Sequence, residues 1–175
     1  MAGAMIAQPA RPTLEEFEAV LARHDSATRA LEEWCALRGM ADPARIAAQS
    51  LAPAADGVPD AVREALRPGP GEKVALRNVR LVCGDAVLSV AWNWYVPGRL
   101  TAAMNAALQG TDTPFGKVVS PLGFRRRSLA TLRGPDGNCP ADTVSTHRAM
   151  LILPDDRPLA YLVECYTAAN LAPVD

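Results

Sequence analysis

This sequence lacks the features that would assign it to a membrane or nucleic-acid-binding class. It holds no run of about 18 apolar residues, the length from which a membrane-spanning helix is inferred. Its 18 basic side chains are matched by 19 acidic ones, for a formal net charge of −1. No overall field would therefore attract nucleic acid or a membrane surface. The N-terminus has no basic region before its short apolar patch, so we expect no secretory signal.

Cysteine and histidine are also scarce. The cysteines are Cys35, Cys83, Cys139 and Cys165. They form no CxxC or other paired spacing, so we expect them to be reduced in a cytoplasmic protein. His24 and His147 are the two histidines, and without a Cys/His cluster no metal site is predicted. No P-loop, dinucleotide fingerprint, nucleophile elbow or zinc signature is present.

The pattern along the chain predicts one α+β domain. Residues 1–12 are interpreted as a disordered Ala/Pro-rich lead, and residues 13–175 as the domain. Helical signals, among them a capping box at Thr13–Glu16, fill the stretch up to residue 66, although residues 43–52 are ambiguous. Strand signals follow, interrupted by a helix over residues 100–110. The predicted strands cover residues 74–83, 87–95, 124–132, 145–153 and 159–166. Helices followed by sequential strands predict an antiparallel sheet.

Two lone charges of opposite sign lie in otherwise apolar strand-like segments. Alternation puts Arg77 on the same face as Ala75, Val79 and Leu81, and Glu164 is the only charge in residues 159–166. A charge on a core face is costly unless it meets a partner or a ligand. The pair therefore indicates either a buried salt bridge or the two ends of a site for a small, polar-ended ligand.

Two further segments carry chemistry that the sequence leaves open. Residues 110–117 (GTDTPFGK) indicate either a simple turn or a loop whose N–H groups meet an anion. Residues 125–127 (RRR) lie in a predicted strand, so Arg126 faces one side and its two neighbours the other. We expect one arginine to point inward to an anionic ligand and the rest to be solvated. His147 is interpreted as a structural histidine, with a general acid or base as the alternative.

Four segments, taken in order, resemble the chorismate pyruvate-lyase family, which makes 4-hydroxybenzoate. Residues 25–32 (DSATRALE) resemble the family's Asp-Ser-x-Thr segment, and residues 76–81 (LRNVRL) its Leu-Arg-Glu strand. Residues 113–117 (TPFGK) are similar to its Thr-Pro-Leu-Gly-Arg loop, and Arg127 falls where a later strand carries an arginine. Residues 157–164 (RPLAYLVE) resemble the strand that ends at its active-site glutamate.

The resemblance implies a sheet of about six antiparallel strands with helices on one side, and a ligand enclosed under two helical flaps. It also implies that the protein needs no metal or organic cofactor. Arg77 would hold the ring carboxylate and Glu164 would lie at the hydroxyl-bearing end, as the catalytic residues. The implied substrate-binding residues are Ala27, Phe115, Gly116 and Arg127.

From this resemblance we expect a chorismate lyase, a carbon–oxygen lyase that releases pyruvate and 4-hydroxybenzoate or an isomer, as in ubiquinone biosynthesis. It would be a cytoplasmic monomer. Glu164, beside Leu162 and Val163, would have a raised pKa and could donate a proton. Arg77 and Glu164 would be separated by about one aromatic ring. The alternative is a non-catalytic domain of this fold that recognises an aromatic carboxylate, as in bacterial transcription regulators. The absence of a preceding helix-turn-helix segment favours the enzyme.

Overall fold

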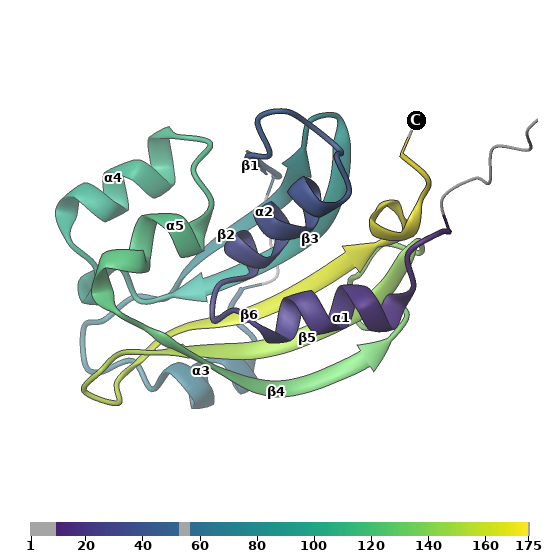
Figure 1. Cartoon of the computed structure of the whole chain (residues 1–175). Helices are drawn as coiled ribbons and strands as arrows, with labels where there is room; N and C mark the ends of the chain where they lie inside the picture. The colour runs from purple at the N-terminus through teal and green to yellow at the C-terminus, as the bar shows by residue number, and fades with distance from the viewer. Residues whose placement is uncertain (1–9, 53–56, 175) are drawn as a thin grey trace, which may run out of the picture.

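A six-stranded antiparallel sheet forms the centre of the molecule (Figure 1). The computed structural model describes residues 10–52 and 57–174, so the interpretation of residues 1–9 as a disordered lead lies outside the described residues. The strands follow one another in the sheet in the order β1-β2-β3-β6-β5-β4. Their bounds are β1 Ile46–Ser50, β2 Ala75–Cys83, β3 Ala86–Tyr95, β4 Arg125–Arg133, β5 Thr143–Ile152 and β6 Pro158–Thr167. The predicted α+β fold class and its antiparallel sheet are confirmed.

Helices on one face of the sheet form two clusters. The α-helices are α1 Leu14–Ala22, α2 Ala27–Leu37, α3 Asp60–Leu66, α4 Ala102–Gly110 and α5 Phe115–Val119. Three short 3₁₀ segments, Pro97–Arg99, Ser120–Leu122 and Ala168–Leu171, complete the described elements. Helices α1 and α2 bury apolar side chains against β2 and β3, and α4 and α5 pack against the same face towards the start of β6. Together they lie over one face of the sheet (Figure 1).

Helix α3 packs on the opposite face. Its buried Val62 and Leu66 contact a second apolar layer that contains Trp94, Met150 and Tyr161. Both faces of the sheet are therefore covered over part of their area, which explains why the central strands show few exposed positions.

The register of the central strands fixes where the two lone charges lie. Arg77 on β2 is opposite Asn93 on β3, which is opposite Leu162 on β6. Glu164 lies opposite Ala91, one row further along the same face. Arg77 and Glu164 therefore share the helix-covered face, with β3 between their strands.

Two segments differ from the sequence expectations. The ambiguous residues 43–52 contain the edge strand β1, whose pairing with β2 decides against a helix that alanine content alone would favour. The 110–117 loop ends in α5, which begins at Phe115 directly after Pro114, so its last part is neither a simple turn nor an open loop.

The four cysteines form two disulfides, so the expectation of reduced thiols is wrong. Cys35 at the end of α2 is bonded to Cys83 at the end of β2, and Cys139 is bonded to Cys165 on β6. The pairs are 48 and 26 residues apart, separations that show no pattern in the sequence. The cytoplasmic assignment rested on reduced thiols and loses that support. In the part of the chain that the structure describes, no helix is long and apolar enough to cross a membrane.

We predict that the denatured, unreduced protein reacts with no equivalents of an alkylating reagent, and that reduction exposes all four thiols. Intact-mass spectrometry measures both. In the chain-entropy model, closing loops of these lengths stabilises the fold by about 3–4 kcal/mol each. Alkylation of the four cysteines before reduction would show that they are free thiols, as the sequence analysis expects.

Candidate functional site

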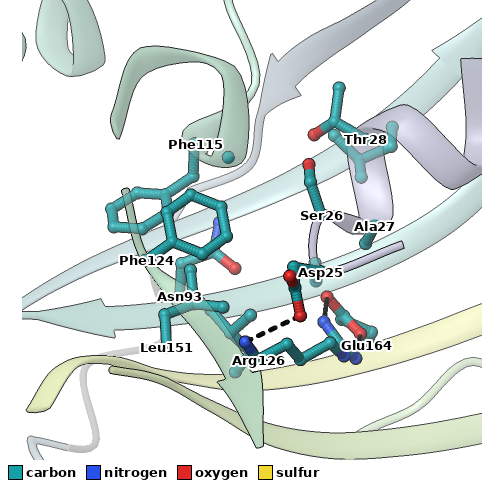
Figure 2. A pocket seen from close by; sticks show the side chains of 14 residues that line it. Asp25, Ser26, Ala27, Thr28, Asn93, Phe115, Phe124, Arg126, Leu151 and Glu164 are labelled. Carbon is teal, nitrogen blue, oxygen red and sulfur yellow. Dashed lines mark hydrogen bonds and ion pairs between the residues drawn. The ribbon is translucent and has the colours of Figure 1, made fainter. Parts of the chain in front are cut away.

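A narrow cavity lies between the sheet and the first turns of α2 and α5 (Figure 2). Its water-accessible volume is about 30 Å³. The walls combine aliphatic side chains of the central strands, two phenylalanine rings and a group of polar side chains. The lining residues are Asp25, Ser26, Ala27, Thr28, Leu81, Ala91, Asn93, Phe115, Gly116, Phe124, Arg126, Leu151, Leu162 and Glu164. We call this space the central pocket.

A buried ion pair forms the polar end of the central pocket. Arg126 on β4 donates to both carboxylate oxygens of Glu164, with Nη1–Oε1 and Nη2–Oε2 distances of 3.1 and 2.5 Å. The Tyr166 hydroxyl donates to Oε2 of the same carboxylate at 3.0 Å. The exposed fractions are 14% for the Arg126 side chain and 3% for that of Glu164. The salt bridge that the sequence allowed is therefore present, but its cation is Arg126.

This pairing reverses the expected ionisation of Glu164. Burial alone would raise the pKa of its carboxyl group, but the charge and hydrogen bonds of Arg126 outweigh burial and lower the pKa below its ordinary value. For Arg126, burial lowers the pKa and the Glu164 carboxylate raises it. The effect of Glu164 is larger, so the pKa of Arg126 lies above its ordinary value. The prediction of a raised glutamate pKa is wrong because the apolar neighbours in sequence did not reveal the arginine across the sheet. Glu164 is held as a charged acceptor.

Arg77 is buried but does not line the central pocket. Its guanidinium donates to the Thr113 carbonyl oxygen at 2.7 Å and to that of Thr111 at 3.1 Å. Burial lowers the pKa of this guanidinium. Among the described residues, no hydrogen bond or ion pair joins Arg77 to Glu164. Arg77 therefore fixes the segment that leads into α5, which forms one wall of the pocket.

The structure brings Ala27, Phe115 and Gly116 to the central pocket but not Arg127. Arg127 lies opposite Met150 in the β4–β5 register, on the sheet face that α3 covers, whereas Arg126 lies opposite Leu151 on the pocket face. Strand alternation predicts that Arg126 and Arg127 lie on opposite faces, but the flanking residues do not indicate which of the two points into the pocket. Arg126 is the pocket residue that the family resemblance missed.

Two contacts hold the polar rim of the pocket in place. The Asp25 carboxylate accepts a hydrogen bond from the Arg126 backbone N–H at 3.1 Å, which joins the α1–α2 turn to β4. The Ser26 hydroxyl caps α2 by accepting from the Arg29 N–H at 3.4 Å. Gly116 packs directly on this cap, since a Cβ at that position would lie 2.7 Å from the Ser26 Oγ. The close approach of α2 and α5 therefore depends on Gly116 having no side chain.

His147 belongs to a neighbouring polar cluster. Its Nε2 lies 2.9 Å from the Glu18 Oε2, and the Ser145 hydroxyl donates to the same carboxylate. The ring also packs edge-on against Tyr166, with centroids 5.0 Å apart. These contacts join α1 to β5 and agree with the structural interpretation of His147.

Comparison with known proteins gives one sequence relative and a shared fold. No protein-family model matches the chain. The uncharacterized protein y4mC of Sinorhizobium fredii is 36% identical, over a match that covers 88% of this chain and 73% of that protein. The chain belongs to the family of y4mC.

Solved structures with the same fold are ligand-binding parts of transcription regulators. The effector domain of PhnF from Mycobacterium smegmatis superposes with a TM-score of 0.57 at 14% identity, covering 82% of this chain and 88% of that domain. The ligand-binding domain of a GntR-family regulator from Bordetella bronchiseptica gives a TM-score of 0.51 at 18% identity, covering 70% and 82%. At such identities the likeness shows the fold alone.

These neighbours correct the expectation of an enzyme. The resemblance to chorismate lyase holds for the fold, and the matched structures named above are a ligand-binding domain and an effector domain of regulators, not lyases. The chemistry of the site agrees with the correction. The expected carboxylate anchor, Arg77, is occupied by backbone carbonyls, and the expected proton donor, Glu164, is held ionised by Arg126.

We predict that Gly116→Ala lowers the free energy of unfolding by about 1–3 kcal/mol, because the added methyl group forces α5 away from the α2 cap. Gly110→Ala is the matched control. It adds the same methyl group at the end of α4, where no atom lies within 4 Å, and should be neutral or stabilise by up to about 1 kcal/mol. Urea unfolding measures both. Equal effects of the two substitutions would contradict the close packing.

Arg126→Met should destabilise the fold by about 3–5 kcal/mol at neutral pH, because it leaves Glu164 buried and unpaired. The lowered pKa of Glu164 means that the native pair stabilises the protein above the ordinary carboxyl pKa of 4.5 and loses this effect as pH falls through the lowered value. Unpaired Glu164 should instead take up a proton readily. The gap between the variant and the wild type should therefore shrink in acid.

Unfolding curves at several pH values test this prediction. The double variant Arg126→Met/Glu164→Gln removes the stranded charge and should recover most of the loss at neutral pH. A stability gap that does not change with pH, or a double variant as unstable as the single one, would contradict the assignment.

Proposed function

We propose that this protein is a non-catalytic binding domain for a small aromatic carboxylate that carries a hydroxyl group. The observation that supports the proposal best is the mixed lining of the central pocket, in which apolar walls lead to the Arg126–Glu164 pair. Pockets of this kind use apolar surface for affinity and a few fixed polar groups for orientation.

The walls of the pocket suit a flat ring. Leu81, Ala91 and Leu162 rise from the sheet, and the rings of Phe115 and Phe124 close the space from the other side (Figure 2). Phe115 is itself held by Tyr95, with ring centroids 5.2 Å apart. Each aliphatic or aromatic wall that contacts a ring removes apolar area from water, at about 25 cal/mol per Å².

The polar groups around the pocket suit a ligand that carries both a carboxylate and a hydroxyl. The first N–H groups of α2, at Ala27 and Thr28, have no acceptor within the helix and can meet an anion. Asn93 lines the pocket from strand β3, is 6% exposed, and makes no side-chain hydrogen bond with the described part of the chain. The ionised carboxylate of Glu164 can accept a hydrogen bond from a ligand hydroxyl beyond those it already accepts.

Binding a ring requires the pocket to widen. A cavity of about 30 Å³ holds about two water molecules, so the phenylalanine side chains must move outward before a benzoate enters. Phe124 precedes β4 and Phe115 begins α5, and both rings lie at the side of the pocket away from the Glu164 carboxylate (Figure 2). Opening on this side leaves the strands and the ion pair unchanged.

We predict that 4-hydroxybenzoate binds, that benzamide binds more weakly, and that Asn93→Leu weakens 4-hydroxybenzoate binding at least about tenfold, or 1.4 kcal/mol. The substitution keeps the side-chain size and removes the polar group from the pocket. Asn78→Leu is the matched control, because Asn78 lies opposite Trp92 on the other sheet face. Isothermal titration calorimetry gives the dissociation constants.

The same protein incubated with chorismate should release no pyruvate, as a coupled lactate dehydrogenase assay can show. Absence of binding by any hydroxybenzoate isomer, or equal weakening by Asn93→Leu and Asn78→Leu, would overturn the proposed ligand class. Pyruvate release above the spontaneous rate would overturn the non-catalytic role.

A further inference from the structure

A larger cavity lies on the opposite face of the sheet, where the proposed function does not use it. Its volume is about 520 Å³, within the range of small-molecule sites. It is bounded by the C-terminal part of α3, by β4 and β5, and by the turn that leads into β6. The lining residues are Glu64, Ala65, Arg67, Arg125, Arg127, Met150, Ile152, Asp156 and Pro158. We call it the arginine groove.

The floor of the arginine groove is apolar. Met150 and Ile152 on β5 are buried, and Pro158 at the start of β6 is buried beside them. Ala65 adds a methyl group from α3. A ligand that lies in the groove therefore meets a hydrocarbon surface beneath it and charged side chains around it.

The charges around the groove leave two arginines without a partner. Arg125 is neutralised, because it donates to the Asp156 carboxylate at 2.5 Å and to the Leu153 carbonyl oxygen at 3.3 Å. Arg67 and Arg127 make no side-chain hydrogen bond or ion pair within residues 10–52 and 57–174. The three arginines exceed the two acidic residues by one charge. Glu64 also makes no side-chain hydrogen bond or ion pair within the described ranges, so the unpaired charges are two positive and one negative, and the groove is net positive.

The backbone of Arg67 indicates that its place is fixed. Arg67 ends α3 in the left-handed conformation, with φ +46° and ψ +56°, where glycine is usual and another residue costs about 1–2 kcal/mol. Strained backbone of this kind gathers at functional positions. At this position an arginine presents a charge that glycine would not.

Arg99 clamps the two walls of the groove together. Its Nη1 donates to the Leu66 carbonyl oxygen at 2.9 Å and to that of Pro158 at 2.6 Å, and its Nη2 donates to the Arg67 carbonyl oxygen at 3.2 Å. The Glu72 carboxylate neutralises Arg99 at 2.8 Å, and the Arg99 side chain is 7% exposed. A buried arginine thus joins the end of α3, which carries Arg67, to the start of β6. The groove is a built feature and not a gap between loose loops.

We propose that the arginine groove binds a small molecule with a phosphomonoester group on an apolar body. Two unpaired guanidinium groups offer two donor forks, and a phosphate has the three oxygens and the near-double negative charge that can engage both. A carboxylate has only two oxygens and one charge. The apolar body lies on the Met150 and Ile152 floor. This site is separate from the central pocket, since the sheet lies between them.

Titration calorimetry with phenyl phosphate tests the site. The wild type should bind phenyl phosphate more tightly than inorganic phosphate, which lacks the apolar body, and should not bind phenol. Arg67→Gly/Arg127→Ser should weaken phenyl phosphate binding at least about tenfold. Both substitutions suit the fold, because glycine relieves the left-handed backbone and Arg127 is exposed on an edge strand. Arg133→Ser is the control for a positive charge on β4 outside the groove; it removes one such charge and should change affinity by less than about twofold.

Four results would overturn the proposal: no binding of phenyl phosphate, equal affinity in the double variant and the wild type, equal weakening by Arg133→Ser, or loss of binding in Asn93→Leu but not in the double variant. The last would place the ligand in the central pocket. An aspartate-rich peptide that binds more tightly than phenyl phosphate and depends on the same arginines would make the groove a protein-docking site instead. Retained 4-hydroxybenzoate binding in Arg67→Gly/Arg127→Ser would separate this site from the proposed function.

Discussion

Glu164 lies on a face of the sheet that is otherwise apolar, and Arg126 is the cation that makes a carboxylate tolerable there. The arginine starts on the edge strand β4 and reaches over β5 to the carboxylate on β6. Its backbone N–H at the same time holds the α1–α2 turn through Asp25. One residue therefore ties together the sheet edge, its centre and the helical cover. Leaving either charge of such a pair alone in the interior is far more costly than the pair itself.

Strand-length runs and turn chemistry were enough to predict five of the six strands and the fold class, because these runs are bounded by turn residues such as Gly, Pro and Asp. Edge strand β1 was ambiguous because its alanines favour a helix on propensity alone, and the hydrogen bonds to β2 decide for a strand. The disulfides were missed for a related reason. Cys35 and Cys83 are brought together by packing of α2 against the sheet, which no spacing rule describes.

The site was predicted in part. Ala27, Phe115, Gly116 and Glu164 line the central pocket, but Arg77 and Arg127, which were expected to contact the ligand, do not, and Arg126 does line it. Both differences come from tertiary contacts and side-chain directions that the sequence does not show. Arg77 points towards carbonyl groups of a loop that lies more than 30 residues later in the chain, and Arg127 is one residue out of phase with the pocket face. A family fold constrains where a pocket lies, but the charges within it are set by single residues of each chain.

The disulfide between Cys35 and Cys83 has a consequence for how the central pocket can open. It fastens the C-terminal part of α2 to the end of β2, whereas Ser26 and Ala27 border the pocket at the other end of the same helix. About 12 Å of helix separates the fastened end from the pocket, at 1.5 Å per residue. Helix α2 therefore cannot slide away from the sheet as a body. Any movement of this helix that widens the pocket is a rotation about the disulfide, and it must also break the hydrogen bond between the Asp25 carboxylate and the Arg126 backbone N–H at the pocket end.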